Sequence, residues 1–249
     1  MPSDLTDRIA RVRERVDHAA TAAGRRPADV RLMLATKTQD AETVLAAVAA
    51  ATELAAGRGD DGPVLIGENR VQELVAKAPA LADLVAAGRL DVHMIGSLQR
   101  NKINQMLPTV TGLAGVDRLS LAQAVAQRCV RDGRTLDVMV QVNVSGESSK
   151  SGAAPSDAAD LASAVAALDG LHLTGFMTIG ANTSDEAQVR AGFARLREIR
   201  DEVVASGAPG TADARELSMG MSTDLELAVA EGATIVRVGT AVFGERPPA

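Results

Sequence analysis

Residues 217–244, LSMGMSTDLELAVAEGATIVRVGTAVFG, repeat one pattern twice: a short apolar run, a loop with glycine and hydroxyl residues, and a helix-forming segment. We expect strands at 215–218 and 235–238, with a helix at 223–231 between them. A strand, a helix and a second strand in this order form a right-handed crossover between parallel strands. The stretch therefore predicts an α/β fold with a parallel sheet.

The same alternation extends back to the start of the chain, where short apolar runs predict strands and apolar residues at helical spacing predict helices. The remaining strands are expected at 30–36, 64–66, 91–95, 112–116, 136–143 and 171–177. The remaining helices are expected at 5–23, 41–55, 68–85 with a break near Pro79, 101–107, 119–130, 155–168 and 185–205.

Eight strands that alternate with helices in 249 residues match the size of a closed barrel. We predict a single (β/α)8 TIM-type barrel that spans residues 1–249 as one domain. An open doubly wound sheet is the alternative. No long linker or shift in composition indicates a second domain.

Composition limits the classes of partner. The net charge is −6 and the charges are spread along the chain, so no basic surface for nucleic acid or for an anionic membrane is expected. Cys129 is the single cysteine, and the N-terminal segment has no continuous apolar run, so a cytoplasmic protein is expected. The three histidines have unrelated spacings, so no metal site is predicted. No hydrophobic repeat indicates a dimer, and a monomer is expected.

The predicted strands end in polar and glycine-rich segments, and in a barrel of this kind the chemistry gathers where strands end. Two neighbouring loops, after the last two strands, combine glycine with hydroxyl residues at the start of a helix. Such loops suit a phosphate monoester, which indicates Ser218, Gly239 and Thr240 as phosphate ligands. The strand ends are 36–38, 67–69, 96–97, 143, 177–178, 218–220 and 237–240.

Lys37 directly follows the first predicted strand, after five uncharged residues, and is expected over the barrel mouth. Lys77, in contrast, is expected as a solvated charge on a helix face, and Lys150 as a solvated charge in a loop. Desolvation and a nearby cation favour a neutral amine at Lys37. A neutral lysine beside a phosphate site suits a Schiff base with a phosphorylated aldehyde, in a sugar-phosphate aldolase or a pyridoxal phosphate (PLP) site. Arg237 can face a ring nitrogen in the second case.

Several motifs together resemble the pyridoxal phosphate homeostasis proteins, a PLP-binding family whose fold is similar to the barrel domain of alanine racemase. The resemblance extends in order from about residue 5 to residue 246, and the segment 218–246 is specific enough to support it alone. It implies a PLP fold of type III without a second β domain. The motifs are LMLATKTQD, IGENRVQEL, HMIGSLQRNK, VNVSGESSKSG, GFMTIG and LSMGMSTDLELAVAEGATIVRVGTAVFGER.

The resemblance also implies roles for single residues. Lys37 would form a covalent aldimine with PLP, and Arg237 would face the pyridine nitrogen. The phosphate would be held by Ser218, Gly239 and Thr240, the oxygen side of the ring would lie near Asn69, and Met219 and Ser222 would be further contributors. The chain departs from the family pattern at Arg70 and Val92, where an aromatic residue is usual, so packing around the cofactor is expected to differ.

The same residues favour a carrier over an enzyme. An arginine opposite the pyridine nitrogen leaves the ring unprotonated, which makes it a poorer electron sink. A racemase of this architecture takes a second base from a tyrosine on an additional β domain, whereas this chain has no tyrosine. We therefore predict a protein of PLP homeostasis that stores PLP or delivers it to PLP-dependent apoenzymes, without turnover. The alternative is a single-domain PLP-dependent amino-acid racemase. An aldolase is disfavoured because the sequence shows no clear general acid or base for that reaction, and because Arg237 lies on the last strand.

Overall fold

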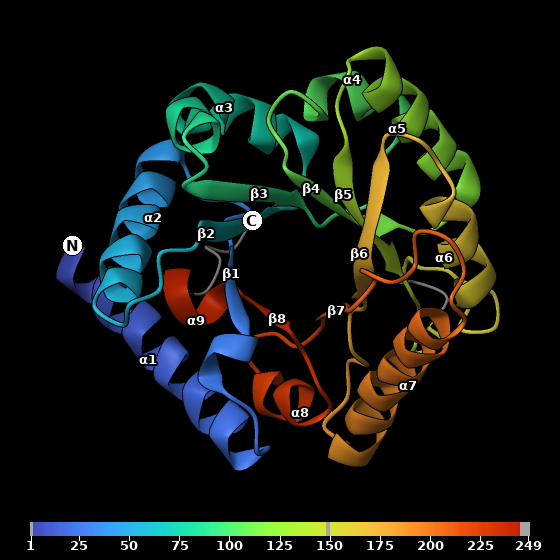
Figure 1. Cartoon of the computed structure of the whole chain (residues 1–249). Coiled ribbons are helices and arrows are strands. Elements are labelled where there is room, and N and C mark those ends of the chain that lie inside the picture. Colours follow the sequence, from blue (N-terminus) through green and yellow to red (C-terminus); the bar gives the residue numbers. More distant parts are fainter. Residues whose placement is uncertain (1, 148–149, 245–249) are drawn as a thin grey trace.

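The computed structural model describes residues 2–147 and 150–244. Eight parallel strands close into a barrel in the order β1 to β8, each paired with its neighbours along the chain and β8 paired with β1. The helices form a ring around the outside of this barrel (Figure 1). The structure therefore confirms the predicted (β/α)8 barrel and rules out the open doubly wound sheet.

The strands are β1 (Arg31–Ala35), β2 (Val64–Glu68), β3 (Leu90–Met94), β4 (Gly112–Val116), β5 (Leu136–Gln141), β6 (Leu171–Met177), β7 (Glu216–Ser218) and β8 (Ile235–Val238). The α-helices are α1 (Pro2–Ala22), α2 (Ala41–Ala56), α3 (Val71–Ala86), α4 (Ile103–Met106), α5 (Leu119–Arg131), α6 (Ala158–Ala166), α7 (Glu186–Ala205), α8 (Leu225–Ala230) and α9 (Thr240–Phe243). Two short 3-10 helices, η1 (Pro27–Asp29) and η2 (Arg100–Lys102), complete the order of elements. None of the helices within the described ranges has a stretch long and apolar enough to cross a bilayer.

The region between β2 and α3 differs from the sequence-based prediction. Glu68 belongs to β2, whereas it was expected to begin the following helix. The helix also continues through Pro79, where a break was expected. Leu74 and Leu81 are both fully buried on the two sides of this proline, and burial of that apolar face outweighs the backbone hydrogen bond that proline cannot make.

Side chains alternate along each strand between the barrel interior and the layer beneath the helices. On β1, Met33 packs inside the barrel, whereas Leu34 belongs to the core that joins barrel and helices. Residues from other strands fill the interior with Met33: Leu65, Ala114, Met139, Met177 and Ile235. The interior of the described barrel is therefore a packed core, and a ligand is expected at one of its ends.

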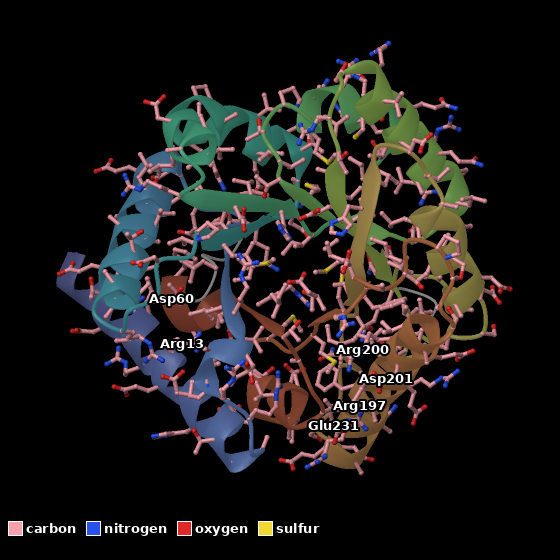
Figure 2. The ribbon with its side chains drawn as sticks, viewed as in Figure 1. Arg13, Asp60, Arg197, Arg200, Asp201 and Glu231 are labelled. Carbon is pink, nitrogen blue, oxygen red and sulfur yellow. The ribbon has the colours of Figure 1, made fainter. Side chains whose placement is uncertain are left out.

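Ion pairs join the outer helices to each other. Arg197 of α7 donates to a carboxylate oxygen of Glu231 at the end of α8 at 2.6 Å, and Arg190 contacts the same carboxylate at 2.8 Å. Figure 2 shows Arg197 and Glu231 side by side on this edge of the ring. These contacts hold the helices that flank the last two strands.

The barrel interior also contains one histidine, His93 on β3, which is 7% exposed. Its Nδ1 atom has no hydrogen-bond partner within the described residues, and the ring packs directly against Gly112 of β4. Burial lowers the pKa of His93 from its ordinary value of 6.5 to about 4, although Asp91 opposes the shift. His93 is therefore neutral near neutral pH.

We expect His93 to make the fold sensitive to acid. The unfolded chain binds a proton at this residue below pH 6.5, whereas the folded protein resists protonation until pH 4, so its contribution to stability is lost as pH falls through this window. The loss by pH 4 is about 3 kcal/mol. Urea unfolding across this pH range should show a shallower decline in His93→Gln than in the unsubstituted protein. The control is His18→Gln, at an exposed histidine. Equal slopes for all three proteins would contradict this role.

Candidate functional site

The candidate site lies at the carboxyl ends of the strands, where β8, β1 and β2 are neighbours. Lys37 is partly buried two residues after the end of β1. Lys37 lies in the turn that directly follows β1, the strand on which Met33 packs inside the barrel. On the adjacent strand Arg237 pairs with Met33, and a Cβ atom at Gly239 would come within 3.4 Å of the carbonyl oxygen of Ala35. The structure thus brings the ends of β1 and β8 together at the barrel mouth.

Arg237 is 5% exposed and lies inside the barrel. Its guanidinium donates to the Oγ atom of Ser218 on β7 at 2.9 Å and to the carbonyl oxygen of Thr178 at 2.7 Å. Burial lowers the pKa of Arg237 to about 10, with the Asp224 carboxylate acting in the opposite direction. Arg237 therefore remains a cation at neutral pH and presents only hydrogen-bond donors.

The loops after β7 and β8 meet beside this arginine. The main-chain N–H of Ala241 donates to the Oγ atom of Ser222 at 3.3 Å, which joins the two loops. Thr240, the first residue of α9, is exposed. Met219 behaves differently, because its side chain is fully buried in the core between barrel and helices. Any contact of Met219 with a ligand at the mouth would have to come from its main chain.

Asn69 is exposed immediately after β2 and lies against the end of β3. A Cβ atom at position 96 would come within 2.1 Å of the Asn69 carbonyl oxygen, so only glycine fits at Gly96. Beside Asn69 a solvent-open hollow of about 590 Å³ is lined by Asn69, Arg70, Val71, Gln72, Glu73, Ser97, Gln99 and Lys102. Arg70 is exposed at its rim, whereas Val92 is fully buried. Of the two departures from the family pattern, only Arg70 therefore borders the mouth.

A second cavity, of about 340 Å³, lies at the opposite end of the barrel. It is lined by the beginnings of β1 and β2, including Val30 and Val64, and by residues of α1 and α2. Arg13 and Asp60 belong to its lining and are seen on the α1–α2 side of the ring (Figure 2). Its position at the amino ends of the strands separates it from Lys37 and Arg237.

Two predictions about lysines were wrong. Lys77 was expected as a solvated charge, but it is 4% exposed and forms an ion pair of 2.7 Å with Glu68. Lys150 was expected as a solvated loop charge, but its side chain is 15% exposed and donates to Glu147 at 2.6 Å and to the Gly180 carbonyl oxygen at 2.8 Å. Both amines satisfy groups that the folding of distant segments brings to them. Residues 148–149 of the motif around Lys150, and residues 245–246 of the last motif, lie outside the described residues.

Sequence reasoning missed two elements of the site. The carbonyl group of Thr178 accepts a hydrogen bond from Arg237, and the only signal was its position at the end of β6. The pair of Glu68 and Lys77 was also missed, although Lys77 lies at helical spacing from Leu74 and Leu81, which are both buried. A lysine within the apolar stripe of a helix signals a buried partner. Among the described residues, no group of three or more histidine, cysteine, aspartate or glutamate side chains could hold a metal ion.

Comparison with known proteins agrees with this geometry. Residues 8–247 match the family model of the alanine racemase N-terminal domain, which defines the class of barrel. The pyridoxal phosphate homeostasis protein of Pseudomonas aeruginosa is 43% identical over 98% of this chain and 96% of its own length. The chain therefore belongs to the pyridoxal phosphate homeostasis protein family, as the motifs predicted.

Solved structures support the same assignment. The crystal structure of an unknown protein from Bifidobacterium adolescentis is 45% identical, with a TM-score of 0.87 over 97% of this chain and 95% of that chain. PipY of Synechococcus elongatus, solved with PLP bound, is 31% identical, with a TM-score of 0.77 over 96% of this chain and all of that chain. The fold and the family are thus consistent across sequence and structure.

Proposed function

We propose that this protein binds PLP at the barrel mouth, as a Schiff base on Lys37, and stores it or delivers it to PLP-dependent apoenzymes. The observation that carries the proposal is the convergence of Lys37, buried Arg237 and Gly239 at the adjoining ends of β1 and β8. The PLP-bound structure of a relative with the same fold supports the choice of ligand.

The donor groups at the mouth fit a phosphorylated aromatic aldehyde. The Lys37 amine can form an imine with an aldehyde, which is the chemistry that PLP supplies when bound. The loops after β7 and β8 offer hydroxyl groups and main-chain N–H groups to the phosphate, from Ser218, Ser222, Gly239 and Thr240. With PLP bound, the guanidinium of Arg237 would donate to the pyridine nitrogen, and Asn69 would hold the oxygen side of the ring. Met219 would contribute only through its main-chain carbonyl oxygen, because its N–H donates to the carbonyl oxygen of Ile235 at 3.1 Å.

We propose that the protein does not turn PLP over with a substrate. Arg237 has a pKa of about 10 and carries only donors, so it can hydrogen-bond to the ring nitrogen as a cation but holds that nitrogen unprotonated. An unprotonated ring withdraws electrons less strongly from a bound amino acid. The 249 residues also contain no tyrosine to act as a second base. These features support a carrier.

The test is the absorption spectrum of the purified protein with PLP, before and after treatment with borohydride. We expect a visible band that borohydride removes, with the reduced pyridoxyl group found on the peptide that contains Lys37. Reduction fixes only an imine, so the mapped position identifies the amine directly. A pyridoxyl group on Lys102 or Lys150, or the absence of a reducible band, would refute the proposal.

A racemase remains the competing function, and isotope exchange separates the two. The protein loaded with PLP is incubated with alanine or serine in deuterium oxide, and deuterium at Cα is measured by mass spectrometry. We expect incorporation no faster than with free PLP, because the sequence has no tyrosine to act as a second base and an unprotonated PLP ring would withdraw electrons weakly. Incorporation at a catalytic rate, saturable in amino acid, would establish the racemase instead.

A further inference from the structure

Two side chains of α3 hold the peptide groups on either side of Lys37. The carboxylate of Glu73 accepts a hydrogen bond from the main-chain N–H of Thr38 at 2.9 Å. The amine of Lys77 donates to the main-chain carbonyl oxygen of Thr36 at 2.8 Å. Glu73 and Lys77 are four residues apart, so they lie on one face of the helix. One helix face therefore contacts the chain just before and just after Lys37.

The contact on the Thr36 side is buried and rigid. The carboxylate oxygen of Glu68 that pairs with Lys77 at 2.7 Å also accepts from the Thr36 hydroxyl at 2.5 Å. Lys77 is 4% exposed and Glu68 is fully buried. Charge-assisted hydrogen bonds in such a dry environment restrict motion strongly. The Thr36 peptide is thereby tied to both β2 and α3.

The contact on the Thr38 side stabilises an unusual backbone. Thr38 has a φ of 68°, the only positive φ of a non-glycine residue within the described ranges. A β-branched residue in this region is strained, and such strain persists only where surrounding contacts hold it. The Glu73 carboxylate is such a contact. This turn directs the chain away from the strand immediately after Lys37. It therefore fixes the backbone position from which the Lys37 side chain extends.

We infer that Glu73 and Lys77 are positioning residues that fix the direction of the Lys37 amine at the barrel mouth. Orientation matters because an amine must approach an aldehyde carbon along a narrow range of directions. Glu73 is the residue to test, because its side chain is 24% exposed and its replacement leaves the buried pair intact. The importance of this orientation for PLP rests on the proposed function, but the orientation itself can be measured without PLP.

The first experiment is trace acetylation of the PLP-free protein with acetic anhydride across a pH series, with the label on each lysine measured by mass spectrometry. We expect Glu73→Ala to raise labelling of Lys37 relative to Lys102 by about threefold, because loss of one hydrogen bond to a charged acceptor frees the turn. Glu73→Gln, which keeps an acceptor oxygen, should restore the original ratio. Asp83→Ala, at an exposed acidic residue near the other end of α3, is the matched control.

The second experiment measures how much PLP becomes fixed to Lys37 by borohydride after a brief exposure. We expect a fall of about tenfold in Glu73→Ala, recovery in Glu73→Gln and no change in Asp83→Ala. Unfolding midpoints of all variants show whether the fold is intact. If the unsubstituted protein fixes no PLP on Lys37, the proposed function fails. The ratio of Lys37 to Lys102 acetylation then remains the test of whether Glu73 positions Lys37. If Glu73→Ala leaves that ratio unchanged, the positioning role is refuted, regardless of how much PLP becomes fixed to Lys37.

Discussion

Replacement of Lys37 by alanine is expected to abolish the borohydride-reducible absorption band completely. An imine needs a primary amine within reach of the aldehyde, and the described structure places Lys37 at the mouth beside β8, whereas Lys77 is held in a buried ion pair. The substitution leaves the loops after β7 and β8 unchanged, and we propose that these loops bind the phosphate, so PLP should still bind weakly and without a covalent bond. The measurement is the spectrum with excess PLP, followed by denaturation and a count of pyridoxyl groups per chain.

Controls for this variant are Lys102→Ala and Lys150→Ala, which should keep the reducible band. Lys102 lines the hollow beside Asn69, so it tests whether a nearby amine can substitute for Lys37. The circular dichroism spectrum of Lys37→Ala should match that of the unsubstituted protein, because Lys37 lies beyond the end of β1 and is only partly buried. An unchanged band in Lys37→Ala would end the proposal that this residue holds PLP.

Replacement of Lys77 by methionine is expected to lower the free energy of unfolding by about 3–5 kcal/mol. The substitution removes the cation that pairs with the buried Glu68 carboxylate, which keeps only the Thr36 hydroxyl as a donor. The Thr36 carbonyl oxygen loses the Lys77 amine and keeps the N–H of Gln39. A buried charge that loses its partner retains the full cost of desolvation. Urea unfolding near neutral pH, followed by circular dichroism, measures the change.

The double variant Glu68→Gln/Lys77→Met separates the loss of a partner from the loss of the pair. Removing both charges removes the unpaired carboxylate, and the glutamine can still accept from the Thr36 hydroxyl, so most of the stability should return. A fall of less than about 1 kcal/mol in Lys77→Met would show that Glu68 reaches water or takes up a proton instead. No recovery in the double variant would show that the methylene packing of Lys77, not its charge, stabilises this region.

Lys37 and Lys77 have different environments, although both come after mostly apolar residues. Their local sequences alone do not distinguish an amine at the barrel mouth, where we propose that Lys37 binds PLP, from an amine that pairs internally. The difference comes from Glu68, which the end of β2 places against α3. That contact depends on the packing of α3 on the barrel.

The sequence by itself determined the barrel and the approximate positions of its strands, although not the ends of β2 and β5. Eight apolar runs of strand periodicity alternate with runs of helix periodicity, and this pattern is enough to predict the barrel. Burial of each apolar face and the right-handed crossover leave few other arrangements of these elements. Site residues near one another in the chain, such as Arg237 and Gly239, were also accessible, because glycine and hydroxyl residues between a strand and a helix have a local chemical meaning. The motifs then indicated the family.

Only the tertiary structure decided which polar groups are buried and what they contact. The pairing of Lys77 with Glu68, the bond from Glu73 to the Thr38 peptide and the bond from Arg237 to the Thr178 carbonyl oxygen each join different elements of the barrel. Periodicity shows which face of an element is buried, but the charge of a partner on another element leaves no trace in local spacing. A lysine within an apolar stripe thus signals that a partner exists, and the closed barrel determines which residue it is.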